Sequence, residues 1–259
     1  MRILFVGDVV APQGCEHLRK VLPALKKAQN IDFCIVNGEN SAQGNGILPG
    51  SCNHILDSGA DLVTTGNHAF RRPEADALYE NENVPLIRPA NFHRQAPGKG
   101  YYILEKKGMR LGVINLMGRI YMDSVDNPFD EADRLLAKLN EAGVKNILVD
   151  FHAEATSEKR VMGFYLDGRV SAVLGTHTHV GTADEQLLPG GTAYITDVGM
   201  TGVVNSVLGV EISCASRKVI TGLPVHFINP EGECMMNCVV VETDNKTGRA
   251  VSIERLDIR

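Results

Sequence analysis

Apolar runs typical of buried strands alternate with segments typical of helices along most of the chain. We expect strands at 2–6, 32–36, 61–65, 146–151 and 170–174, and helices at 15–28, 49–58, 73–81, 130–142 and 157–166. Pro49 and Pro73 suit the first turn of a helix, where a backbone amide hydrogen has no partner within the helix. Such alternation predicts an α/β fold with a mostly parallel β-sheet.

Two regions depart from this alternation. Strands at 101–105 and 110–115 flank a short segment, Lys-Lys-Gly-Met, which predicts an antiparallel hairpin. From Ala193 onward, short alternating runs at 218–221, 225–229, 234–243 and 250–256 predict a second sheet. Because no linker-like composition separates the two parts, we expect one domain over residues 1–259 that contains two sheets.

Composition restricts the classes of partner. The chain has 259 residues, of which 44% are hydrophobic and 22% are charged, as in folded globular proteins. The formal net charge of −5 disfavours long nucleic acid, which needs a basic face, but allows a small phosphorylated substrate. With no apolar run near the roughly 20 residues of a membrane span and no signal-peptide pattern, we expect a cytoplasmic protein without a membrane partner.

The six cysteines are interpreted as reduced thiols.

Polar side chains that can bind metal ions follow the predicted strands. His177 and His179 come just after an apolar run, and in an extended backbone two residues at this spacing point the same way. Ligands of open α/β sheets lie beyond the carboxyl ends of the strands, so side chains from several strand ends meet there. The candidates at such ends are Asp8, Glu39, Asn40, Asn67, His68, His152, His177 and His179.

This mixture of carboxylates, amides and imidazoles exceeds the needs of a single ion. A catalytic zinc usually takes three protein ligands, whereas a mixed oxygen and nitrogen set suits two harder or borderline metals. Two ions roughly 3.5 to 4 Å apart activate a bridging water and hold the oxygens of an in-line phosphoryl displacement. The sequence therefore favours a two-metal hydrolase.

The ordered motifs resemble the calcineurin-like metallophosphoesterases, and within them the bacterial YmdB-like branch of cyclic-nucleotide phosphodiesterases. The resemblance covers nearly the whole chain and rests on Gly-Asp at 7–8, Asn-Gly-Glu-Asn at 37–40, Gly-Asn-His at 66–68, His152 and Gly-Thr-His-Thr-His at 175–179. Segments 88–91, 97–101, 150–158 and 197–202 look like the branch in particular. The resemblance implies a four-layer α-β-β-α sandwich, in which two mixed β-sheets are flanked by helices.

The resemblance also implies a ligand set. Asp8, Glu39, Asn40 and His179 would hold one ion, Glu39, Asn67, His152 and His177 would hold the other, and Glu39 would bridge them. The wider superfamily has a His where this chain has Val10 and an Asp where it has Glu39. We expect Asn40 to fill the place of the missing imidazole, which makes that site richer in oxygen and favours iron or manganese, with zinc also compatible.

The expected activity is hydrolysis of 2′,3′- or 3′,5′-cyclic nucleotides by metal-bound hydroxide, with His68 protonating the leaving oxygen, as the similar family position does. Glu154 and Asp197 are candidates to orient ligand imidazoles, although surface acids explain them as well. Alternatives that stay open are a phosphomonoesterase, a nuclease acting on RNA ends, and a regulatory protein that binds a nucleotide with little turnover. A homo-oligomer is compatible with the sequence.

Overall fold

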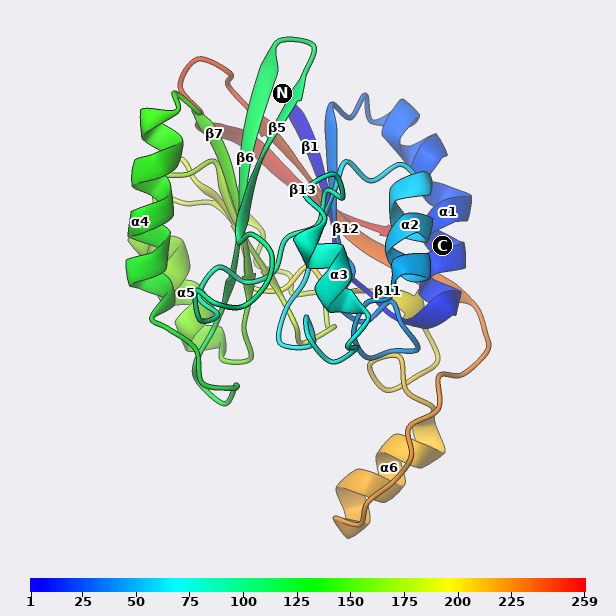
Figure 1. The fold of residues 1–259 in the computed structure, drawn as a ribbon. Coiled ribbons are helices and arrows are strands. Elements are labelled where there is room, and N and C mark those ends of the chain that lie inside the picture. Colours follow the sequence, from blue (N-terminus) through cyan, green and yellow to red (C-terminus); the bar gives the residue numbers. More distant parts are fainter.

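The computed structural model describes residues 1–259 and has two β-sheets stacked against each other, with helices on both outer sides (Figure 1). The first sheet contains β1 (Arg2–Val6), β2 (Asp8–Val9), β3 (Phe33–Asn37), β4 (Leu62–Thr64), β11 (Met200–Val203), β12 (Cys234–Thr243) and β13 (Ala250–Ile258). The second contains β5 (Tyr101–Lys106), β6 (Met109–Met117), β7 (Asn146–His152), β8 (Ala172–Thr176), β9 (Gln186–Leu187) and β10 (Ala193–Ile195). Both sheets are mixed, so the expected α-β-β-α sandwich is confirmed.

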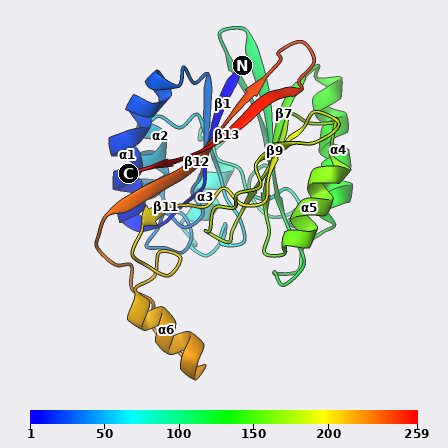
Figure 2. The same cartoon turned by 180° about the vertical axis from the view of Figure 1, so that it is seen from behind.

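The helices cover the outer faces of the two sheets. On the first sheet lie α1 (Ala11–Ala28), α2 (Pro49–Asp57) and α3 (Ala75–Glu80), and on the second lie α4 (Pro128–Glu141) and α5 (Thr156–Tyr165). A sixth helix, α6 (Ile212–Thr221), projects away from the layers, as both views show (Figures 1 and 2). None of the helices has both the length and the apolar character needed to cross a bilayer.

The apolar core lies in three layers between these elements. The middle layer joins the two sheets, where Ile3 and Phe5 of β1 belong to the same buried cluster as Leu111 and Val113 of β6. A second cluster lies under α1 and α2, and a third lies under α4 and α5. Burial of this apolar surface is the main favourable contribution to folding, so the sandwich needs both sheets to be complete.

Helix α4 illustrates how local sequence fixes an element. The Asn127 side chain caps the helix by accepting a hydrogen bond from Phe129 N. Pro128 occupies the first turn, where backbone amides have no partner within the helix, so the lack of an amide hydrogen in proline costs no hydrogen bond. Acidic side chains in the first turn complement the helix dipole. The buried positions Ala132, Leu135, Leu136 and Leu139 recur at helical spacing, so one face of α4 packs on the sheet.

The parallel strands of both sheets place the candidate site. Strands β1, β3 and β4 run parallel in the first sheet, and β6, β7 and β8 run parallel in the second. The polar motifs found in the sequence follow the carboxyl ends of these strands. The two sheets therefore bring segments far apart in the chain to one end of the sandwich.

The prediction for the tail of the chain was wrong. Strands β12 and β13 join the first sheet, where β12 pairs antiparallel with β1, and the second sheet is built from β5 to β10. Residues 218–221 belong to helix α6 and residues 225–229 form no strand. The β-branched residues Val219 and Ile220 favour a strand locally, but here they lie on an exposed helix without a pairing partner. The six cysteines are free thiols, as expected.

Candidate metal centre

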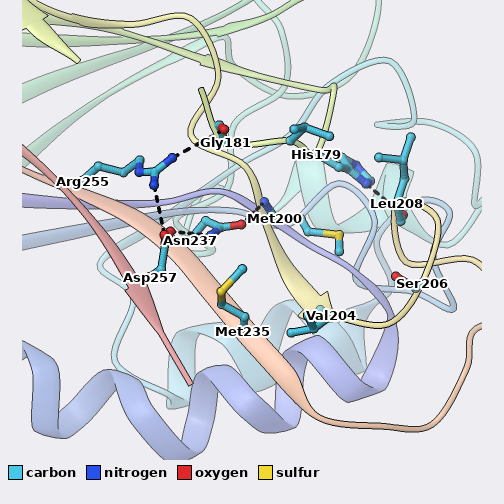
Figure 3. Close-up of a pocket in the computed structure, with 12 residues that line it drawn as sticks. His179, Gly181, Met200, Val204, Ser206, Leu208, Met235, Asn237, Arg255 and Asp257 are labelled. Carbon is cyan, nitrogen blue, oxygen red and sulfur yellow. Dashed lines mark hydrogen bonds and ion pairs between the residues drawn. The ribbon is translucent and has the colours of Figure 1, made fainter. Parts of the chain in front are cut away.

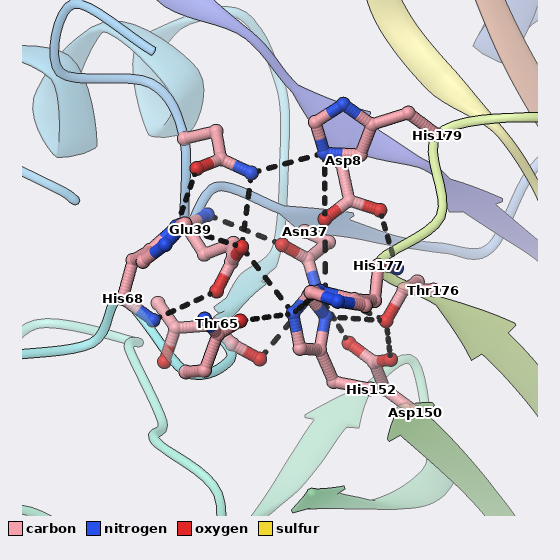
Figure 4. Close-up of polar contacts among 12 residues, drawn as sticks. Asp8, Asn37, Glu39, Thr65, His68, Asp150, His152, Thr176, His177 and His179 are labelled. Atoms are coloured by element: carbon pink, nitrogen blue, oxygen red, sulfur yellow. Dashed lines mark hydrogen bonds and ion pairs between the residues drawn. The ribbon is translucent and has the colours of Figure 1, made fainter. Parts of the chain in front are cut away.

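The predicted site residues lie in one cluster, of which Figure 4 labels Asp8, Glu39, His68, His152, His177 and His179. Asn40 joins the cluster through its contact with Glu39, and Asn67 through its contact with His152. Asp8 begins β2, Glu39 and Asn40 follow β3, and Asn67 and His68 follow β4. From the other sheet, His152 ends β7, and His177 and His179 follow β8. Both sheets thus contribute side chains to the cluster.

The tightest part of the cluster surrounds His152. Its Nε2 lies 3.3 Å from Glu39 Oε1, 3.0 Å from Asn67 Oδ1 and 3.1 Å from His177 Nδ1. The candidate ligand atoms of Glu39, His152 and His177 all lie within 4.8 Å of one another. This is the set expected for one of the two ions.

The set expected for the other ion surrounds Asp8. The Asp8 Oδ1 atom is buried without a hydrogen-bond partner and lies 3.8 Å from His179 Nε2. Asn40 Nδ2 lies 2.9 Å from Glu39 Oε1 and 3.1 Å from His179 Nε2, while Asn40 Oδ1 faces His68. A half-turn of the Asn40 amide exchanges its two terminal atoms, and only the turned form presents an oxygen to an ion held by Asp8 and His179.

His68 is fixed beside this cluster at two atoms. Its backbone amide donates to Glu39 Oε2 at 3.1 Å, and its Nδ1 lies 2.8 Å from Asn40 Oδ1. The side chain is partly exposed and lines the cavity in front of the cluster. The imidazole is therefore oriented by its Nδ1, which leaves Nε2 for a ligand.

A buried polar network orients His152 from behind. His152 Nδ1 lies 2.9 Å from Thr176 Oγ1, which donates to Asp150 Oδ1 at 2.7 Å, and Asn37 Nδ2 donates to Asp150 Oδ2 at 3.0 Å. Because the Thr176 proton points to Asp150, Thr176 accepts the Nδ1 proton of His152, and Nε2 is left for a metal. Sequence reasoning missed the supporting roles of Asp150, Asn37 and Thr176. The sequence does contain a signal for Asp150, because a charged residue within an apolar strand is expected to be buried with a polar partner.

The loop that carries His177 and His179 has an unusual backbone. Their φ angles are 99° and 62°, in a region that side-chain-bearing residues rarely adopt. Thr178 between them donates to Asp197 Oδ2 from its backbone N at 3.0 Å and from its Oγ1 at 2.7 Å. Glu154 Oε2 lies 3.1 Å from His177 Nε2, whereas Asp197 is buried and supports the loop through Thr178.

Burial and charge shift the protonation of the cluster when it holds no cation. Burial raises the pKa of Asp8. Burial also acts to raise the pKa of Glu39, but the His152 and His68 imidazoles hold it well below its ordinary value. Burial lowers the pKa of His152, yet Glu39 and Asp8 raise it by more, to about 9. Burial and the charge of His152 lower the pKa of His177 to about 3. In the absence of a metal, the proton of His152 compensates the charge of Glu39.

Two cavities adjoin His179. The larger, of about 1040 Å³, is lined by Glu39, Asn40, His68, His177 and His179 and lies in front of the cluster. The smaller, of about 380 Å³, includes Met200, Met235 and Arg255 (Figure 3). Arg255 donates to the Gly181 and Thr182 carbonyls and forms an ion pair with Asp257. Its guanidinium is therefore bonded to groups of the protein itself. The larger cavity is the one that opens on the candidate ligands.

Sequence comparison places the chain among phosphoesterases. A family model described as YmdB-like protein matches residues 4–256. A Bacillus subtilis (strain 168) protein named 2′,3′-cyclic-nucleotide 2′-phosphodiesterase is 46% identical over 257 residues, which cover 99% of this chain and 96% of that protein.

Solved structures share the fold of this chain. A hypothetical protein from Thermus thermophilus superposes with a TM-score of 0.93 and 43% identity, over 99% of this chain and 98% of that one. A structure described as a novel phosphatase of Mycoplasma pneumoniae gives a TM-score of 0.92 and 31% identity, over 100% and 93% of the two chains. A 5′-nucleotidase precursor, also from Thermus thermophilus and 15% identical with a TM-score of 0.58, shares the fold over 54% of its length.

Proposed function

Because this chain belongs to the YmdB-like protein family, we propose that it is a metal-dependent phosphodiesterase that hydrolyses 2′,3′-cyclic nucleotides. Its relatives are named as a phosphodiesterase and a phosphatase, and the chain is a phosphoric ester hydrolase. The observation that carries the finer proposal is the position of His68. It lies beside a buried Glu39 at which both candidate ligand sets meet, and it faces a cavity large enough for a nucleotide.

The donor set fits metal ions. Asp8 Oδ1 is a buried carboxylate oxygen without a hydrogen-bond partner, and a buried charge is unfavourable unless a cation or donor compensates it. The two groups that we propose to hold the ions are Asp8, Glu39, Asn40 and His179 for one, and Glu39, Asn67, His152 and His177 for the other. Their oxygen content favours iron or manganese, and zinc remains compatible. When bound, such ions supply Lewis-acid stabilisation of phosphoryl oxygens and activation of water.

His68 is proposed as the general acid. Water adds to phosphorus and releases one proton to solvent, the bond from phosphorus to the ribose 2′-oxygen breaks, and His68 Nε2 gives a proton to that oxygen. The products are a 3′-phosphate and a free 2′-hydroxyl, and solvent then reprotonates His68. The contact of the backbone amide with Glu39 holds residue 68 in place for this transfer. When Asn40 is turned so that its oxygen faces an ion, its amide nitrogen faces His68 Nδ1 and donates to it, which keeps a ring proton on Nε2. An imidazole can donate a proton near neutral pH, which contributes about 10²- to 10⁴-fold in rate.

The activity is tested on purified protein whose bound metals are measured first. Turnover is then compared for 2′,3′-cyclic and 3′,5′-cyclic nucleotides, for a bis-aryl phosphate and for a mono-aryl phosphate. We expect metal-dependent hydrolysis, fastest with 2′,3′-cyclic nucleotides, and its loss on chelation. Faster hydrolysis of the 3′,5′-cyclic compounds would contradict the proposed linkage.

A phosphomonoesterase with the same site is the second candidate, because one related structure is described as a novel phosphatase. The mono-aryl phosphate distinguishes the two. Preference for the monoester over the bis-aryl compound would favour this second candidate. Full metal occupancy without turnover of any substrate would instead indicate a regulatory nucleotide-binding protein.

A further inference from the structure

The large cavity has two kinds of lining, which we call its polar wall and its arm wall. The polar wall includes candidate ligands and His68. The large aliphatic and aromatic side chains of the lining form the arm wall, and all of them come from one segment, residues 204–232, which we call the arm and which includes α6 (Figure 1). These arm residues are Leu208, Val210, Val225, Phe227 and Ile228. A ligand with its phosphate at the polar wall therefore shares the cavity with apolar side chains of the arm.

The arm contacts the site at two places. His179 Nδ1 lies 3.0 Å from the Leu208 carbonyl oxygen, so a candidate ligand contacts the arm directly. Gly44, in the loop that follows β3, lies against the Asn229 side chain, where an added Cβ would be 2.6 Å from Nδ2. Within the arm, the same Nδ2 donates to the Gly209 carbonyl at 3.0 Å. These contacts place the arm wall beside the metal centre, while 51% of Phe227 stays exposed.

We propose that the arm wall is a subsite for the nucleobase of the substrate, with Phe227 as the stacking residue. The inference rests on the proposed function and extends it to a specific part of the substrate. A nucleobase has an apolar π-face, and an exposed aromatic ring that lines the same cavity as a phosphate site can stack on that face. A substrate that is anionic at one end and planar at the other matches the two walls.

The test compares a nucleotide with a substrate that has no base, using the metal-loaded protein. Phe227→Ala is assayed with 2′,3′-cyclic AMP and with 1-O-methylribose 2′,3′-cyclic phosphate. We expect KM for cyclic AMP to rise by about tenfold, because stacking of one base contributes roughly this much. Its kcat and the kinetics of the base-free substrate should stay unchanged. Phe227→Tyr should restore the KM, and Ile220→Ala, on the exposed part of α6 outside the cavity, serves as the control.

The outcomes separate this proposal from the proposed function. Equal effects of Phe227→Ala on both substrates, or no effect on either, would overturn the subsite while phosphodiesterase activity remains. A wild-type protein that hydrolyses neither substrate would overturn the proposed function itself.

Discussion

Lys159 Nζ lies 2.6 Å from Asp197 Oδ2, and both side chains are almost completely buried. The pair joins α5 to the residue that holds the histidine loop, because the same Oδ2 accepts both bonds from Thr178. The Lys159 ammonium and the two Thr178 donors compensate the cost of burying the Asp197 carboxylate. The conformation of the loop therefore depends on a charge pair outside the metal centre.

Removal of Lys159 should destabilise the fold strongly. In Lys159→Met the Asp197 carboxylate stays buried without its cation, which should lower the free energy of unfolding by about 3–5 kcal/mol. Urea denaturation of the metal-free protein measures this change. Lys99→Met is the matched control, because Lys99 pairs with Glu82 at 2.7 Å on the exposed surface, where such pairs contribute little. Equal effects of the two variants would contradict the role of the buried pair.

Thr176→Val should lower the affinity for metal clearly, with only a small change in the stability of the metal-free protein. The variant keeps the shape of Thr176 but removes the link between His152 Nδ1 and Asp150. Loss of such an orienting contact typically lowers metal affinity by about 10- to 100-fold. Chelator competition measures the affinity, and thermal unfolding of the metal-free protein measures stability. Thr221→Val, on the exposed α6, is the control, and an affinity equal to that of the wild type would refute the orienting role.

His68→Ala should reduce turnover without loss of metal. We expect kcat to fall by about 10²- to 10⁴-fold, because the variant removes the proposed proton donor. Bound metal, measured by elemental analysis, should stay at the wild-type level. His17→Ala is the control, since His17 contacts the Ile258 carbonyl far from the cluster. Full activity of His68→Ala with both metals bound would exclude the general-acid role.

Metal affinity should rise with pH. The pKa of His152 in the metal-free protein is raised to about 9, so its imidazole is protonated at neutral pH. A metal ion needs the neutral ring and must displace this proton, so binding weakens as pH falls below about 9. The expected slope is up to about tenfold in affinity per pH unit for this proton, with a plateau above that pKa. Calorimetry in buffers of different ionisation enthalpy measures proton release, and no release at neutral pH would contradict the prediction.

Local patterns were sufficient for most elements of the first two thirds of the chain and for the residues that follow strand ends. Asp8, Glu39 and His152 stand directly at or after apolar runs, but they come from two different sheets, so their convergence also depends on how the sheets stack. The supporting residues were harder to identify because their partners are distant in sequence. Lys159 lies in a helical pattern where a lysine is normally solvated, and only its approach to Asp197 shows that it is buried.

The assignment of the tail to a second sheet was wrong for the same reason. The alternation in 234–243 predicts a strand but not its neighbours, because pairing with β1 depends on contacts between opposite ends of the chain. The helix α6 was missed because β-branched residues such as Val219 and Ile220 favour strands. These side chains are exposed, so the sequence shows no buried helical face that would have predicted a helix.

The position of β12 between β1 and β11 has a consequence for biosynthesis. Strand β12 holds the backbone next to Asp8, since Gly7 N donates to the Asn237 carbonyl at 3.0 Å. A nascent chain that has not yet released residues 234–243 from the ribosome leaves one edge of β1 unpaired. The Asp8 carboxylate, which follows β1, is then not fixed against the histidine loop. We expect assembly of the metal centre to wait for this strand, so a chain interrupted before it should emerge without a loaded site.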